Sequence, residues 1–184
     1  LSFRSSKREV EEFYDKLSSS YDVLYGEEQL EKYSEAFKLL GGKLSGTVLD
    51  AGCGTGLLFS RLKGFREIIA VDISRGMLLR AREKASGKSH IHLVRCDVER
   101  LPFRSNVFDT CFSFTVLQNL PNPFEALREL GRVASPKAAI AVTLMDGVEG
   151  LPSLREALKL LGLQTALISH VRREALLAGF KGNL

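Results

Sequence analysis

The chain has 184 residues, enough for one ordinary domain with a full hydrophobic core. Its composition, 45% hydrophobic and 26% charged, excludes a disordered segment, and no apolar run approaches the roughly 20 residues that a membrane span requires. A net charge of +4 leans only mildly toward an anionic partner. The three cysteines lack the CxxC spacing of zinc sites. We therefore expect reduced thiols, no metal site and a cytoplasmic protein.

Two amphipathic helices are expected at the start of the chain. Apolar residues recur at helical spacing from Val10 to Leu17 and again from Leu30 to Leu40. We assign residues 1–45 to an N-terminal helical segment and residues 46–184 to a core, the two forming a single domain.

Short apolar runs then alternate with helical patterns. Strands are expected at 47–51, 67–72, 91–96, 108–114 and 138–144, and helices at 57–63, 76–85 and 124–133. Asn122 and Ser153 have the spacing of helix N-caps, Ser153 with Glu156 three residues on. Continuous apolar strands joined by helices predict an α/β fold with a doubly wound, mainly parallel sheet.

The C-terminal part has a weaker pattern. Residues 163–170 could form a sixth strand and residues 172–177 a short helix, so the sequence provides no seventh strand. A sheet that stops early has an unpaired edge. That edge leaves room for a homodimer or for a partner subunit.

The strongest motif follows the first strand, where Asp50 leads into Gly52-Cys53-Gly54-Thr55-Gly56. Glycines are needed where backbone approaches a ligand closely or adopts a positive φ. A helix that starts directly after such a loop presents free N–H groups to an anionic group. A dinucleotide fingerprint requires its third glycine at position 57, which is Leu here. The spacing argues against NAD and FAD.

The run from Val48 to Gly56 closely resembles the first motif of the class I S-adenosylmethionine-dependent methyltransferases. The resemblance implies that S-adenosylmethionine is the cofactor. It also implies that Gly52, Cys53 and Gly54 pass against its methionyl part, with Asp50 near the amino end. Asp72 ends the second strand about 20 residues past the loop, where an acid can accept hydrogen bonds from both ribose hydroxyls.

Further positions match the family along the chain. Ile73 and Met77 are then placed to touch the adenine, and Asp97 and Val98 match the residues that meet its amino group and ring. Phe114 ends the fourth strand, which in the family lies beneath the cofactor and borders the substrate. The pairs Tyr14-Asp15 and Tyr21-Asp22 resemble a Tyr-Asp lid, so the N-terminal segment is expected to act as a lid in which Tyr14 or Tyr21 packs across the cofactor. Simple packing of these two rings onto the sheet is the alternative.

The resemblance implies transfer of a methyl group to an acceptor that the motifs do not identify. We favour a small molecule. The Asn-Pro-Pro-Tyr motif of adenine-N6 methyltransferases is absent after the fourth strand. The alternatives are an RNA or protein methyltransferase acting with a partner subunit, and a non-catalytic cofactor-binding subunit. No residue is assigned a catalytic role, because an in-line displacement at a sulfonium depends mainly on positioning.

Overall fold

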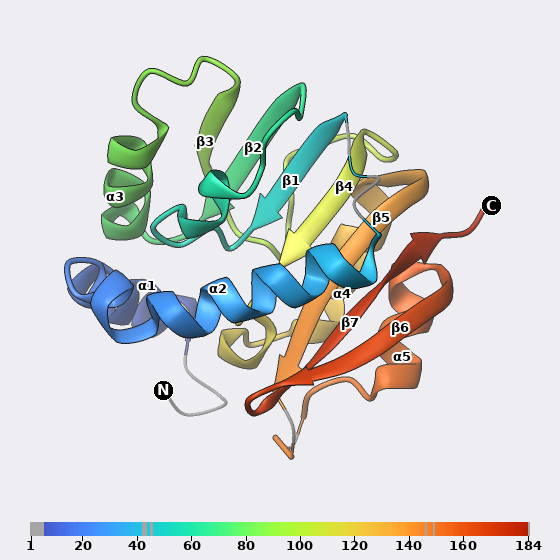
Figure 1. The fold of residues 1–184 in the computed structure, drawn as a ribbon. Helices are drawn as coiled ribbons and strands as arrows, with labels where there is room; N and C mark the ends of the chain where they lie inside the picture. The colour runs from blue at the N-terminus through green and yellow to red at the C-terminus, as the bar shows by residue number, and fades with distance from the viewer. Residues whose placement is uncertain (1–5, 42–43, 45, 146, 149, 184) are drawn as a thin grey trace.

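The computed structural model describes residues 6–41, 44, 46–145, 147–148 and 150–183, and shows a sheet with helices on both faces (Figure 1). Residues 1–5, 42, 43 and 45 of the predicted N-terminal segment lie outside the described part. The elements in chain order are α1 (Lys7–Leu17), α2 (Tyr21–Leu39), β1 (Thr47–Ala51), the 3₁₀ turn η1 (Leu57–Ser60), β2 (Glu67–Asp72), α3 (Arg75–Ala85), β3 (Ile91–Arg95), β4 (Phe108–Ser113), the 3₁₀ turn η2 (Leu117–Asn119), α4 (Pro123–Val133), β5 (Ala134–Met145), α5 (Leu154–Leu161), β6 (Leu163–Val171) and β7 (Glu174–Lys181).

The sheet has the strand order β3-β2-β1-β4-β5-β7-β6. Strands β1 to β5 pair in parallel, and β7 runs antiparallel to both β5 and β6. The strand order reverses between β1 and β4, which is where ligands of doubly wound sheets bind. The predicted fold class is confirmed.

The prediction that the sheet lacks its last strand is wrong. Residues 174–181 form β7, not the short helix expected at 172–177, and β7 lies between β5 and β6. Ala175, Leu176 and Leu177 are all at most 2% exposed. Burial between two strands outweighs the helical propensity of this short run. The argument from an incomplete sheet to a second subunit therefore does not hold.

The helix predicted at 57–63 is also wrong, because η1 is only one 3₁₀ turn. Leu58, Phe59 and Leu62 are each at most 4% exposed, and the tight turn lets all three face the core. The loop that precedes it thus leads into no α-helix, and the expected helix N-terminus for an anionic group is absent at η1.

Two hydrophobic clusters cover the two faces of the sheet. Residues of α2, η1 and α3 pack with the sheet on one face, and residues of α4 and α5 pack on the other. Both predicted caps form, since Asn122 and Ser153 accept hydrogen bonds from the backbone of Glu125 and Glu156. The helices α1 and α2 lie across the carboxyl ends of the parallel strands (Figure 1).

No helix in the described part of the chain is long and apolar enough to cross a membrane.

Candidate active site

The glycine loop after β1 turns back toward β2. The N–H groups of Gly52 and Cys53 both donate to the carbonyl of Val71, at 2.8 and 2.9 Å. Gly52 has φ +79°, and a Cβ placed there would lie 2.3 Å from Cγ2 of Val116. Only glycine fits this position without strain or displacement. These contacts fix the conformation of the loop backbone between the carboxyl end of β1 and Val116, which follows β4.

Two carboxylates, Asp50 and Asp72, lie beside this loop. Asp72 accepts hydrogen bonds from the N–H groups of Gly54 (2.9 Å) and Ser74 (2.8 Å). Asp50 is 3% exposed, and its Oδ2 has no hydrogen-bond partner within the described residues. Burial, and then the charge of Asp72, raise the pKa of Asp50 to about 8. Burial raises the pKa of Asp72 to about 6, against the opposing effect of its backbone hydrogen bonds. A buried acceptor without a donor is costly, so Asp50 suits a ligand that brings a hydrogen-bond donor or a positive charge.

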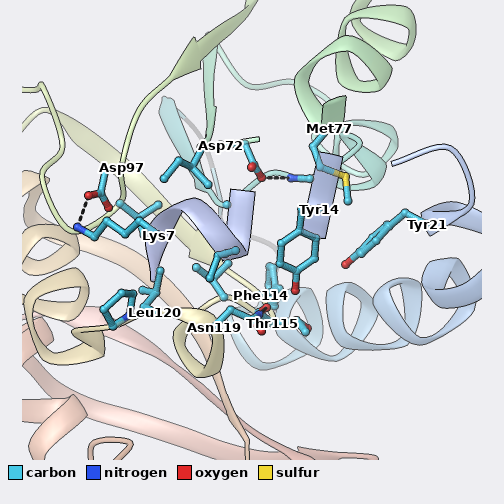
Figure 2. Close-up of a pocket in the computed structure, with 17 residues that line it drawn as sticks. Lys7, Tyr14, Tyr21, Asp72, Met77, Asp97, Phe114, Thr115, Asn119 and Leu120 are labelled. Carbon is cyan, nitrogen blue, oxygen red and sulfur yellow. Dashed lines mark hydrogen bonds and ion pairs between the residues drawn. The ribbon is translucent and has the colours of Figure 1, made fainter. Parts of the chain in front are cut away.

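A pocket lies at the reversal point of the strand order (Figure 2). Apolar and aromatic side chains make up much of its wall, as in small-molecule sites. The residues that line it are Lys7, Val10, Tyr14, Tyr21, Gly52, Gly54, Asp72, Ile73, Met77, Asp97, Val98, Phe114, Thr115, Val116, Asn119, Leu120 and Pro121.

The structure brings most of the predicted cofactor residues together around this pocket. Nine of the eleven line it: Tyr21, Gly52, Gly54, Asp72, Ile73, Met77, Asp97, Val98 and Phe114. Asp50 and Cys53 are not among the lining residues, and both are buried, at 3% and 6% exposed. Burial raises the pKa of the Cys53 thiol well above its usual value, so the thiol stays protonated.

The N-terminal helices close the open side of the pocket. Lys7 forms ion pairs with Asp97 and with Glu99, the latter at 2.6 Å. Asp15 accepts hydrogen bonds from Ser74 Oγ (2.6 Å) and from the N–H of Gly76 (2.7 Å), which fixes α1 to the start of α3. Tyr14 of α1 and Tyr21 of α2 face the pocket (Figure 2), and the role of these helices as a lid stays a prediction.

Sequence reasoning missed a buried polar cluster at one end of the pocket. Lys32 is fully buried, and its ammonium lies 2.7 Å from Glu174 and 2.7 Å from Glu28. It also donates to Thr115 Oγ1 at 2.7 Å. Glu174 falls in the short helix expected at 172–177, so the sequence offers no reason to bring this carboxylate to Lys32. The one available signal was Lys32 beside Tyr33, on the apolar stripe of α2.

Comparisons with known proteins agree with this geometry. A family profile described as a methyltransferase domain matches residues 49–142, just over half of the chain. A demethylmenaquinone methyltransferase of Staphylococcus haemolyticus is 30% identical over 164 residues, which is 85% of this chain and 68% of that protein. The chain belongs to the class I S-adenosylmethionine-dependent methyltransferase family.

One further sequence relative and one solved structure are also similar to this methyltransferase. A malonyl-[acyl-carrier protein] O-methyltransferase of Salmonella typhimurium is 34% identical over 147 residues, but the chain spans only 56% of that protein. A putative methyltransferase of Haloferax volcanii, solved in complex with the Trm112 methyltransferase activator, has the same fold. It superposes with a TM-score of 0.79 at 16% identity, over 95% of this chain and 98% of that one.

The predicted family and the cofactor class are thus confirmed. The residues fit S-adenosylmethionine, because the unpartnered oxygen of Asp50 suits the cofactor's ammonium group and Gly52, which has no Cβ, allows close approach to the loop backbone. The contact of each residue with the cofactor stays a prediction.

Proposed function

We propose that this methyltransferase transfers a methyl group from S-adenosylmethionine to a small-molecule acceptor bound between the end of β4 and the N-terminal helices. The observation that carries the proposal is the pairing of a pocket-lining Asp72 with a buried, unpartnered Asp50 beside a glycine-only loop. The small-molecule acceptor is supported by the position of Tyr14 and Tyr21, which line the pocket from the N-terminal helices.

Each residue has a proposed task in this function. Asp50, Gly52, Cys53 and Gly54 form the methionyl end, with Asp50 opposite the cofactor's ammonium group. The ribose hydroxyls are assigned to Asp72. Ile73, Met77, Asp97 and Val98 form the adenine end. Phe114 and Tyr21 lie at the other end, next to the acceptor.

The cofactor supplies an activated methyl group on a sulfonium. The protein's own contribution is positioning and the exclusion of water. Val116 and Phe114 form an apolar floor, and Tyr14 and Tyr21 cover it from the lid. Burial is the largest cause that raises the pKa of both tyrosines, so both hydroxyls stay protonated near neutral pH. Neither acts as a base there, in keeping with a reaction that depends on alignment.

Calorimetric titration with S-adenosylmethionine, and separately with NAD, tests the proposal. Wild-type protein should bind the former in the micromolar range and show no heat with NAD. Asp72→Ala should weaken binding about tenfold to a hundredfold, as expected for a charged hydrogen-bonding group. The control is Asp109→Ala, since Asp109 lies at the opposite end of the sheet and accepts from the N–H of Thr47. Absence of binding to wild-type protein would refute the proposal.

A second candidate is a methyltransferase of RNA or protein that works with a partner subunit. It is supported by the likeness to the Haloferax protein, whose structure contains an activator subunit. Light scattering of the purified chain, alone and with poly(U) at low and high salt, distinguishes the candidates. A monomer without salt-dependent RNA binding favours the small-molecule acceptor.

We also propose a cytoplasmic location, from the three free cysteines.

A further inference from the structure

The pocket ends at one side in a set of neutral polar groups. Tyr14, Tyr21, Phe114, Thr115 and Asn119 line this side, here called the transfer end. The hydroxyl groups of Tyr14 and Tyr21 both point toward Phe114, Thr115 and Asn119 (Figure 2). This end adjoins the glycine loop, so the methyl acceptor would be bound here if the proposed function is correct.

The transfer end contacts the buried ion pair of Lys32 and Glu174 through the Thr115 hydroxyl. These side chains are 0% and 2% exposed, and their charged atoms are 2.7 Å apart. Thr115 Oγ1 accepts hydrogen bonds from Lys32 (2.7 Å) and from Gln29 (3.0 Å) and donates to Glu174 (3.2 Å). The Thr115 hydroxyl thus has all three of its hydrogen bonds within the protein.

Thr115 also has a strained backbone, with φ +59°. A β-branched residue rarely adopts this conformation, and such strain persists only where the surroundings enforce it. Its N–H donates to Thr143 Oγ1 (2.7 Å), and its carbonyl accepts from Asn119 Nδ2 (2.9 Å). These contacts fix the turn that presents Phe114 and Asn119 to the pocket.

Gln29 extends the cluster to the lid. Its side-chain amide donates to Thr115 and to the hydroxyl oxygen of Tyr21, at 3.0 and 3.4 Å. Since Tyr21 accepts from Gln29, the hydroxyl hydrogen and the second lone pair of Tyr21 remain for a ligand. The buried ion pair therefore positions a neutral hydroxyl at the transfer end.

The cations near the pocket are already neutralised by acids. Lys7 is the one cationic residue among those that line it, and it pairs with Asp97 and Glu99. Lys32, behind Thr115, pairs with Glu28 and Glu174. A carboxylate at the transfer end would have no unpaired cationic side chain opposite it in the described part of the site. Such burial of an anion is unfavourable.

We infer that the methyl acceptor carries an N–H or O–H nucleophile, as an amine, alcohol or phenol does, and that the transfer end rejects a carboxylate nucleophile. The inference rests on the proposed function and narrows its substrate class. The acceptor's lone pair forms the bond to the methyl carbon while the sulfur–carbon bond breaks. The bonding electrons stay on sulfur, and the methylated acceptor gives up its proton to bulk solvent as it leaves the pocket.

Three cofactor analogues test the charge preference by calorimetry. In the first an amine-bearing carbon replaces the methylsulfonium group, and in the other two the methyl is replaced by a carboxymethyl or by a carboxamidomethyl group. The carboxylate and the carboxamide have nearly the same shape, so their affinities differ mainly through charge. We expect the carboxylate to bind at least about tenfold more weakly than the carboxamide. Equal affinity, or tighter binding of the carboxylate, would overturn the inference.

Substitutions test the positioning of Tyr21. Tyr21→Phe should reduce the preference for the amine analogue over S-adenosylhomocysteine by about threefold to tenfold. Tyr25→Phe is the matched control, because Tyr25 is on the same helix and its ring contacts Tyr21, but it does not line the pocket. In Tyr25→Phe the affinities for both ligands should change less than twofold. An unchanged preference in Tyr21→Phe would contradict the role of Tyr21.

Thr115 provides the test of the underlying cluster. Thr115→Ser keeps the hydroxyl and should keep the preference for the amine analogue. Thr115→Val has nearly the same shape without the hydroxyl and should lose the preference as Tyr21→Phe does. If Thr115→Val does not fold, the preference measured in Tyr21→Phe alone tests the role of the Tyr21 hydroxyl. Failure of wild-type protein to bind S-adenosylhomocysteine would refute the proposed function itself, an outcome distinct from equal binding of the two matched analogues.

Discussion

Asp50 combines burial with an oxygen that no donor in the described chain satisfies. Its pKa of about 8, raised by burial and by Asp72, means that the carboxyl is largely protonated at neutral pH. An ammonium group on the ligand favours the ionised form, so binding below pH 8 should release a proton. We predict that the affinity for S-adenosylmethionine falls by up to about tenfold per pH unit between pH 8 and pH 6. Calorimetry in two buffers of different ionisation enthalpy measures the release, and buffer-independent heats would contradict it.

The same carboxyl affects the stability of the protein without cofactor. Its pKa in the folded chain lies above the value of about 3.9 for an unfolded aspartate. Between these values the folded state binds more protons than the unfolded state, so this group makes stability fall as pH rises toward 8. Asp50→Asn should therefore raise the melting temperature at pH 9 more than at pH 5, while weakening cofactor binding. Asp109→Asn, at a half-exposed carboxyl, serves as the control. Equal shifts at both pH values would argue against a buried ionisation.

Alanine substitutions at Gly52 and Gly54 distinguish the cost of backbone strain from the cost of steric overlap. Both have a positive φ, +79° and +54°. A Cβ on Gly52 would overlap Val116, whereas one on Gly54 would meet nothing within 4 Å. Gly52→Ala should thus be less stable than Gly54→Ala by about 1–3 kcal/mol, the usual cost of overpacking. Urea unfolding of the two variants measures the difference. Equal stability would mean that Val116 moves aside freely.

At the scale of the elements, polar contacts tie α1 to the loops around the pocket, among them those of Lys7 and Asp15. Lys7 reaches Asp97 and Glu99, but its side chain is 36% exposed, so solvent screens these pairs. Loss of an exposed ion pair costs roughly 0.5–1 kcal/mol. Lys7→Met should therefore speed hydrogen exchange of the α1 amides by about twofold to fivefold. Arg8→Met, which breaks a solvent-exposed pair with Glu12 on the same helix, should have a smaller effect. Equal exchange in the two variants would show that Lys7 does not hold the lid.

The elements also show what the sequence could reveal. Strands β1 and β2 were predicted to the residue, because their apolar runs are buried on both faces and end at glycine or turn residues. The loop after β1 was found because its glycine spacing differs from that of a dinucleotide fingerprint and resembles the first motif of the family. The strand β7 was missed because Glu174 and two alanines give it no strand pattern, and only its place between β5 and β6 makes it a strand. The cofactor residues came from motifs, whereas Thr115 is placed by contacts with residues distant in the chain.

At the scale of the whole molecule, one buried ion pair connects two segments that are far apart in the sequence, α2 and β7. Lys32 lies on α2 and Glu174 at the start of β7, 142 positions apart, and their charged atoms are 2.7 Å apart. The pair connects the lid helix to the strand that completes the sheet. Because β7 lies between β5 and β6, its position also depends on the folding of the C-terminal strands. The lid and the last strand should thus lose structure together.

This coupling predicts a large effect of Lys32→Met. The change leaves Glu174 buried without its cation, and breaking a buried pair in this way costs about 3–5 kcal/mol. The double variant Lys32→Met/Glu174→Leu removes both charges and should recover most of the stability, because the desolvation of two ions disappears with their attraction. Lys38→Met, at a side chain 76% exposed and paired with Glu35, should change stability by less than about 0.5 kcal/mol. Urea unfolding measures all three. If the double variant is no more stable than Lys32→Met, the loss comes from packing around Lys32 and not from the stranded charge of Glu174.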